Sequence, residues 1–468
     1  MSSISALNSL LSSSSSASSI DLSALLEAAT GASSAGLDVN SAVSAAVTAA
    51  QAPEQAWESQ QSILQSQSTA LTQIQTDATN LDNDMQSLNS LTGPLSARTV
   101  TSSNSSIVSG TAASGSTVGN HVVVVNNLAS TDSWSSSALA NGSTALPAGS
   151  FTITTAGGSS TTITTDGSQT LTDVASEINS DNLGVSANVI TDSTGSRLAI
   201  VANSSGSASN FTVSSSGSLS FTQPVTGINA SVTVDGIAIS SASNTVTGAV
   251  PGLTLNLLSA SAGTEVSLGV TPDTSSASTA INQFVNDYNT LIGALNTQFT
   301  DTGSGEGVLA SDPTVRSLQS ELLQSLSYTF APSSGSTTMP NLSSLGISVG
   351  NDGTLTVDSA TLNSALQNNY SDVQNFFQGS ALNGFANSLD QQLTSFISPG
   401  AGAFTVDLQS ISTQYSGLQD DINNFETNYI TPLQTQLQSS YSQAEIQLQQ
   451  LPTLTKQIEA ELGENSSS

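Results

Sequence analysis

Between Trp57 and Leu95 the apolar residues recur at steps of seven, three and four. The residues on this stripe are Leu64, Leu71, Ile74, Ala78, Leu81, Met85 and Leu88. Such spacing is the a/d pattern of a coiled coil, held over roughly five heptads. A helix of this length extends about 60 Å, twice the width of a small domain, so it cannot bury the stripe against itself. The same chain or a neighbouring chain must supply its partner.

A second heptad stripe lies between Phe404 and Leu462, near the other end of the chain. Its apolar residues include Ile411, Tyr415, Leu418, Ile422 and Phe425, then Leu437, Leu448 and Leu451. Steps of four around Leu437 lengthen the repeat and predict either local unwinding or a break at Pro432. We expect the two stripes to pair and to form the coiled-coil and assembly contacts. Because both are long, we favour contacts between chains, while a plain helical hairpin within one chain fits the same pattern.

The period of the apolar residues changes from 3.5 to 2 after about Thr99, which predicts strands. Ala156-Gly-Gly-Ser and Asp235-Gly236 each separate alternating runs and are typical of hairpin turns. Thr170 and Asp173 have the spacing of a capping box before a short helix. Helical patterns return after Pro272, interrupted by a small hairpin at Asn351-Asp352-Gly353.

The sequence therefore predicts an α+β multidomain protein. Long terminal coiled-coil helices and a helical bundle enclose an inserted pair of β-rich domains. The expected segments are a flexible N-terminal arm (1–35), an N-terminal helical and coiled-coil segment (36–98), a β-rich domain (99–213), a second β-rich domain (214–272), a helical domain with a small hairpin (273–400) and a C-terminal coiled-coil segment (401–468).

Charge is scarce and almost entirely negative. Only 8% of the residues are charged, and four basic residues face 34 acidic ones, for a formal net charge of −30. Phosphate backbones and anionic lipids bind clustered Lys and Arg, so nucleic acid and anionic membranes are excluded as partners. No apolar run reaches the roughly 18 residues of a membrane span. The chain has no cysteine, which excludes disulfides and thiolate chemistry.

No residue pattern indicates catalysis, a cofactor or a metal ion. The one histidine, His121, adjoins an apolar strand and is expected to be structural. Asp82-Asn83-Asp84 is expected on the helix surface, and neither it nor Asn351-Asp352-Gly353 continues into the spacing of a calcium loop. Lys456 follows no glycine-rich phosphate loop. We therefore expect no enzyme and no cofactor.

The flanks of both stripes carry Gln, Ser, Thr and Asn in place of Glu/Lys pairs. Salt bridges at the flanking positions of a coiled coil usually select its partner and register. Here we expect register to depend on shape, apolar packing and amide hydrogen bonds.

An ordered set of motifs resembles a known family. These are Gly36-Leu-Asp-Val-Asn-Ser, the runs at 170–179 and 184–190 within 151–203, the stretch 231–258, Phe284-Val-Asn-Asp-Tyr-Asn-Thr-Leu-Ile, and Leu345-Gly-Ile followed by Asp352-Gly-Thr-Leu. The middle runs resemble a module that flagellins share. The whole set, spanning nearly the entire chain, resembles the bacterial flagellar filament cap proteins, the FliD or flagellar hook-associated protein family.

This resemblance implies a structural, extracellular role at the filament tip. It implies export in unfolded form through the flagellar type III channel, without a cleaved signal peptide, and an export chaperone before secretion. Several copies would form a ring-shaped homo-oligomer that contacts hook-associated proteins and helps each flagellin subunit fold and insert. Some relatives also act in adhesion. The alternative is a flagellin or a hook-filament junction protein, which would polymerise or form a static layer.

The scarcity of basic groups predicts resistance to acid. Protonating the carboxylates of this chain brings its net charge toward zero, so acid produces little positive self-repulsion. We expect circular dichroism melts between pH 2 and pH 7 to show no steep loss of stability at the acidic end. A steep loss below pH 4 would contradict this adaptation to an acidic exterior.

Overall fold

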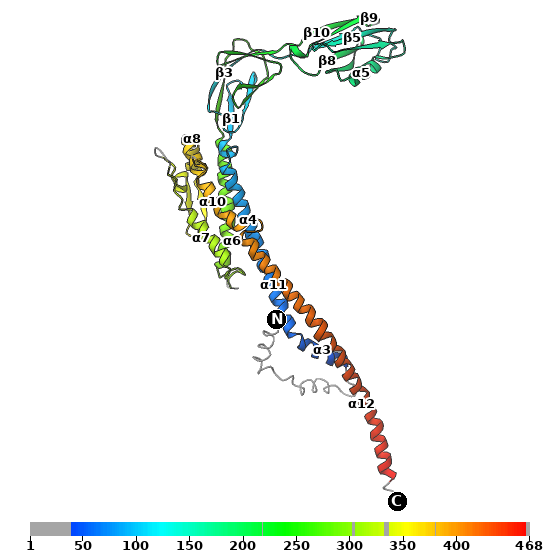
Figure 1. Cartoon of the computed structure of the whole chain (residues 1–468), viewed down its shortest axis with the longest axis vertical. Coiled ribbons are helices and arrows are strands. Elements are labelled where there is room, and N and C mark those ends of the chain that lie inside the picture. Colours follow the sequence, from blue (N-terminus) through cyan, green and yellow to red (C-terminus); the bar gives the residue numbers. More distant parts are fainter. Residues whose placement is uncertain (1–38, 218, 302–304, 332–336, 380, 465–468) are drawn as a thin grey trace. The chain divides into compact units, whose positions relative to one another are not determined.

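The computed structural model describes residues 39–217, 219–301, 305–331, 337–379 and 381–464 (Figure 1). The chain divides into two compact units. Unit 1 comprises Met1–Asp77, Ala294–Leu318 and Thr394–Ser468, and unit 2 comprises Ala78–Gly293 and Gln319–Leu393. The expected N-terminal arm, residues 1–35, lies outside the described residues. Helices and several antiparallel sheets are both present, as the predicted α+β class requires.

Unit 1 is helical in its described part. Its elements are α3 (Val39–Ala50), residues 52–77 of α4 (Ala52–Asn89), the end of α6 (Thr274–Phe299), the start of α7 (Pro313–Ser325), the end of α10 (Phe385–Ile397), α11 (Ala403–Phe425), the π-helical turn η4 (Glu426–Ile430) and α12 (Thr431–Glu464). Helix α4 has Pro53 in its first turn, where the missing N–H of proline costs no helical hydrogen bond.

Helix α4 ends at Asn89, about one turn before Gly93-Pro94, where the sequence predicts its end to within a turn. Pro94 has no N–H and disfavours a helical conformation at the residue before it. Gly93 lies in a tight turn where a Cβ would collide with the carbonyl oxygen of Ser87. The chain then forms the short 3-10 helix η1 (Pro94–Ser96). The predicted boundary is therefore confirmed to within about a turn.

The strands of unit 2 form two separate apolar cores. The first core contains β1 (Arg98–Ser102), β2 (Val108–Ala112), β3 (Gly119–Asn127), β11 (Ala230–Val234), β12 (Ile237–Ser241), β13 (Thr245–Val250), β14 (Leu253–Leu257) and β15 (Val266–Pro272). Their order is β1-β15-β3-β11-β12 in one sheet and β13-β14-β2 in another. Segments before residue 130 thus pair with segments after residue 229, and residues between them form the other core.

That inner core is built from two further sheets and a helix. The strands are β4 (Ser133–Ser136), β5 (Gly149–Thr155), β6 (Ser160–Thr165), β7 (Val185–Asp192), β8 (Gly195–Ala202), β9 (Phe211–Ser216) and β10 (Phe221–Val225), in the orders β10-β4-β8-β7 and β6-β5-β9. The apolar face of α5 (Leu171–Ser180) is buried in the same core. This nesting differs from the expected sequential domains 99–213 and 214–272, because alternation along a strand does not reveal its distant partner.

Two local predictions in these sheets are confirmed. Asp235 and Gly236 join β11 to β12 with φ of 51° and 84°, the paired positive angles of a type I′ turn. The Thr170 side chain accepts the Asp173 N–H, and the Asp173 carboxylate accepts the Thr170 N–H, which completes the capping box of α5.

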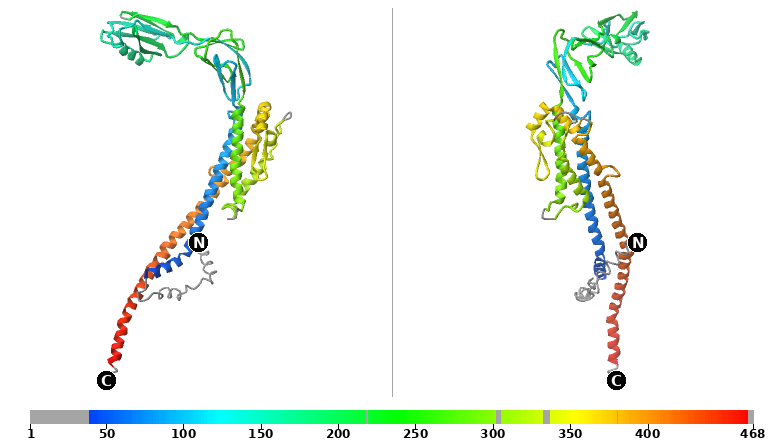
Figure 2. Two further views of the ribbon diagram at one scale, coloured as in Figure 1. Left: turned by 180° about the vertical axis from the view of Figure 1, so that it is seen from behind. Right: turned by 60° about the vertical axis from the view of Figure 1, so that its left-hand side comes forward.

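The helical part of unit 2 packs around aromatic side chains. It contains residues 78–89 of α4, most of α6, the end of α7, η3 (Leu342–Leu345), the hairpin of β16 (Ile347–Val349) and β17 (Leu355–Val357), α8 (Ser359–Asn368), α9 (Tyr370–Gln378) and the start of α10. Phe284, Phe376, Phe377 and Phe385 are buried with ring centroids 5.1–6.4 Å apart. In both views of Figure 2, α6 runs beside the adjacent part of α4.

The stripe of α4 is buried inside its own chain. Leu71, Ile74, Leu81, Met85 and Leu88 are at most 1% exposed, and Leu64 is 6% exposed. In unit 2, α4 contacts α6 through Asp84, α10 through Asp82, and α9 through the Leu88 carbonyl. In residues 78–89 the stripe is therefore covered by helices of unit 2, and not by the C-terminal stripe that we expected to pair with α4.

Two isoleucines on α4 test the burial of this stripe. Ile74 is 1% exposed, whereas Ile63 is 54% exposed. Ile74→Ala should lower the free energy of unfolding by about 2–5 kcal/mol, because it removes buried methyl groups and leaves a cavity. The matched variant Ile63→Ala should change it by less than about 0.5 kcal/mol. Urea unfolding followed by helical circular dichroism measures both, and equal effects would show that the stripe is not buried as described.

Candidate assembly site in the terminal helices

Helices α4 and α11 pair in antiparallel fashion within unit 1. The Gln61 Nε2 donates to the Tyr415 carbonyl at 3.4 Å and to Gln419 Oε1 at 3.3 Å. The Trp57 and Phe425 rings meet edge to face with centroids 5.5 Å apart. Increasing residue number on α4 thus meets decreasing number on α11. The predicted pairing of the two terminal stripes is confirmed for this section.

The predicted assembly residues of the C-terminal stripe are less covered than those of α4. Ile422 is buried at 8% exposed. The half-buried ones are Ile411, Tyr415, Leu418, Phe425 and Leu437. The side chains of Leu448 and Leu451, on α12, lie outside the described residues. Their role in assembly stays a prediction.

A glutamate pair lies near the N-terminal end of α4, where the residues that the structure describes form no salt bridge. The Gln51 Nε2 donates to Glu426 Oε1 at 2.9 Å. Glu54 is 9% exposed, and its Oε2 is buried without a hydrogen-bond donor. Burial raises the pKa of Glu54, and the facing Glu426 carboxyl raises it further. Amide hydrogen bonds and a contact between two carboxyl groups therefore connect these helices. The uncharged flanks predicted the amide hydrogen bonds but not the carboxyl contact.

The stripe unwinds immediately before Pro432 without ending the helix. The Thr431 N–H donates to the Glu426 carbonyl, five residues back, so η4 is one π-helical turn. Proline cannot donate and crowds the preceding turn, which favours this wider turn. Of the two predicted outcomes at Pro432, local unwinding is the one observed.

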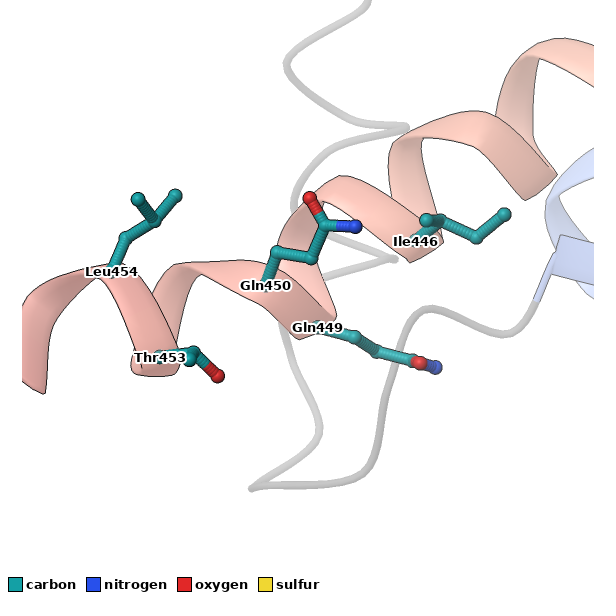
Figure 3. A pocket seen from close by; sticks show the side chains of 5 residues that line it. All are labelled: Ile446, Gln449, Gln450, Thr453 and Leu454. Atoms are coloured by element: carbon teal, nitrogen blue, oxygen red, sulfur yellow. The ribbon is translucent and has the colours of Figure 1, made fainter. Parts of the chain in front are cut away.

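Helix α12 presents apolar side chains to solvent. Tyr429, in the preceding turn, is 52% exposed, Ile446 is 56% exposed and Leu454 is 50% exposed. Ile446, Gln449, Gln450, Thr453 and Leu454 line a shallow hollow of about 450 Å³. Figure 3 shows these five side chains along one stretch of the helix. Exposed apolar side chains that lie next to amide groups make this face of α12 a candidate interaction surface.

His121 has a structural environment in the first β core. Its Nδ1 lies 2.7 Å from Asp235 Oδ2, and Asp235 Oδ1 accepts the Val122 N–H. Among the described residues, no group of three or more His, Asp and Glu could hold a metal ion. Within the same part of the chain, no helix is long and apolar enough to cross a membrane.

The two acidic motifs that lack calcium-loop spacing have different outcomes. Asn351-Asp352-Gly353 joins β16 to β17, so the hairpin prediction is confirmed. The surface placement of Asp82-Asn83-Asp84 was wrong: Asn83 is exposed, but Asp82 is 5% exposed and Asp84 is half-buried. Both aspartates adjoin stripe residues, and a polar residue type alone gave no signal that other helices would cover them.

Comparison with known families matches both ends and the middle of the chain. Residues 35–132 match the N-terminus of flagellar hook-associated protein 2, and residues 227–453 match its C-terminus. Residues 150–204 match the flagellin hook IN motif. The three matches follow one another in the order that the resemblance predicted.

Individual relatives agree with these matches. The lateral flagellar hook-associated protein 2 of Vibrio parahaemolyticus is 29% identical over 42% of this chain and 42% of its own length. Flagellar hook-associated protein 2 of Escherichia coli O157:H7 is 28% identical over 52% of this chain and 53% of its own. The chain thus aligns with about half the length of these curated relatives.

A solved structure extends the likeness to the fold. The crystal structure of the flagellar cap protein FliD, domains D1-D2-D3, from Escherichia coli is similar with a TM-score of 0.59 and 28% identity. The similarity covers 73% of this chain and 99% of that one. With the N-terminal and C-terminal families matched in order and the fold shared, the chain belongs to the flagellar hook-associated protein 2 family.

Proposed function

We propose that this chain is a structural cap at the tip of the bacterial flagellar filament, outside the cell. The observation that carries the proposal is the likeness to the flagellar cap protein of Escherichia coli, which covers nearly all of that chain. No step of this role requires a catalytic group.

The cap would be a ring-shaped homo-oligomer, and the described surfaces suggest which residues join its subunits. The buried stripe of α4 is occupied within its own chain, so it is a poor candidate. The exposed face of α12 around Ile446 and Leu454 has the apolar side chains and amide groups that a contact without salt bridges can use. We propose this face as a contact with a second copy of the chain or with flagellin.

Further partners follow from the same proposal. Flagellin subunits would fold and insert beneath the ring, hook-associated proteins would adjoin it, and an export chaperone would bind the chain before secretion. Adhesion stays a prediction that no surface described here favours.

A flagellin or hook-filament junction protein is the second candidate. It is favoured by the flagellin hook IN motif at residues 150–204, whose description names flagellin. The two candidates differ in how the purified protein assembles. A discrete oligomer of a few subunits supports a cap, whereas long filaments support a flagellin.

Deletion of the encoding gene in its source bacterium tests the cap. The mutant should secrete monomeric flagellin and lack filaments, because subunits leaving an uncapped tip are not retained. The natural gene should restore filaments, seen by electron microscopy. Normal filaments in the deletion mutant would refute the cap.

Complementation with variants tests the face on α12. The double variant Ile446→Gln, Leu454→Gln should weaken assembly by at least about tenfold, since each buried side chain contributes roughly 1.5–3 kcal/mol. Ile63→Gln, Val406→Gln alters two similarly exposed residues outside the hollow and should restore filaments. Equal restoration by both double variants would exclude this face while leaving the cap itself untouched.

A further inference from the structure

Helix α4 presents two aspartates to two different helices of unit 2. Asp82 faces Asp390 on α10, and Asp84 faces Asp287 on α6, each within hydrogen-bonding reach. Residues two apart on a helix point about 200° apart, which places the two aspartates on opposite sides of α4. Each contact between α4 and these neighbours therefore includes a carboxyl group facing a carboxyl group.

In each pair, one buried oxygen of the α4 aspartate has no hydrogen-bond donor among the described residues. Asp82 Oδ2 accepts from Gln86 Nε2 at 2.8 Å, but Asp82 Oδ1 is buried and receives no hydrogen bond from a group with a fixed proton. Asp84 Oδ2 is likewise buried and receives no such hydrogen bond. Among the described residues, the only ion pair joins His121 and Asp235 in the β core, so no Lys or Arg neutralises these carboxyls.

The other groups around these pairs do not supply a charge. On α6, Asp287 Oδ2 accepts from Gln283 Nε2 at 2.9 Å. Tyr288, on the same helix, is fully buried, and burial holds the pKa of its phenol above the ordinary value, so it stays neutral. From α10, Asp390 is the group that meets Asp82.

Two carboxylates within hydrogen-bonding reach of each other repel, and burial raises the free-energy cost of keeping both of them charged. One proton removes both problems, because a carboxylic acid O–H donates to the facing carboxylate. We propose that Asp82–Asp390 and Asp84–Asp287 are proton-binding sites, each holding one shared proton that joins α4 to α10 and to α6. Their ligand is the proton itself, and the helical part of unit 2 is tighter in acid than at alkaline pH.

The pKa shifts agree with this geometry. Burial raises the pKa of Asp82 to about 7, and the hydrogen bond and charge of Asp390 contribute to the rise. Burial likewise raises the pKa of Asp84 to about 7, with the same contributions from Asp287. In the unfolded chain an aspartate has a pKa near 3.9. The folded state therefore binds more protons, and its added stability is complete below about pH 4 and is lost as pH rises through about 7.

A facing pair of carboxyl groups also occurs in unit 1, so such pairs are not confined to one part of the chain. There Glu54 on α4 faces Glu426 in η4, with a raised pKa for Glu54. Composition alone predicted tolerance of acid. The pairs add a positive dependence on acid, since they lose a bond when the proton leaves.

Substitution with asparagine tests the two sites in the full-length chain. An asparagine at 82 or 84 carries an N–H₂ that donates to the facing carboxylate at every pH, while its oxygen can still accept from Gln86 in the first case. In the natural chain, the equilibrium constant for folding should fall by about tenfold or more between pH 4.5 and pH 8. In Asp82→Asn, Asp84→Asn most of that fall should vanish, as measured by urea unfolding and helical circular dichroism.

Controls separate the proton sites from general charge effects. Asp77→Asn also removes a buried α4 carboxyl, but Asp77 already accepts from Gln73 Nε2 at 2.9 Å, so this variant should keep the natural pH dependence. The reciprocal variant Asp287→Asn, Asp390→Asn should behave as the α4 variant does. Infrared spectra at pH 6 should show a protonated carboxyl band that the α4 variant loses, a readout independent of unfolding.

Three outcomes would overturn the proposal. One is a natural chain whose stability is flat or rises from pH 4.5 to pH 8. Another is an α4 asparagine variant with the natural pH dependence and an unchanged carboxyl band. The third is stability that rises with added calcium or magnesium and falls with a chelator, which would show that a cation and not a proton bridges the carboxyls.

Discussion

Helix α4 buries an unbroken apolar stripe against other helices of its own chain, and both units use part of it. Its first half pairs with α11 through Trp57, Gln61 and their partners. Its second half is covered in unit 2 by helices that follow the β-rich segment in the sequence. Since these partners come from distant parts of the chain, the stripe closes long loops of the chain in both units.

Scarcity of positive charge determines how the remaining polar contacts are made. Without Lys or Arg to pair with, buried acids meet amides, as Asp77 and Gln73 do, or meet other acids, as Asp82 and Asp390 do. Contacts of the second kind need a proton. Under the proposed function, the protein works outside the cell. There its folded state would be most stable in an acidic medium, whereas a protein rich in salt bridges would lose them at low pH.

Features set by neighbouring residues could be predicted, and features set by distant ones could not. The heptad stripe, the capping box of Thr170 and the turn at Asp235-Gly236 depend on a few adjacent side chains, and each is confirmed. The nesting of one β core within the segment that forms the other depends on pairing across more than 100 residues, which alternation does not encode. The burial of Asp82 depends on α10, so its residue type suggested the surface.

Because α4 is covered by its own chain, we infer that association between chains uses other surfaces. To test this inference, the protein is diluted until mass photometry shows only monomers. Helical circular dichroism and amide hydrogen exchange are then measured on these monomers. The monomer should keep its helical signal, and the amides of Leu71 to Leu88 should remain protected. Loss of helicity and of that protection on dissociation would contradict it, because the stripe would then depend on neighbouring subunits.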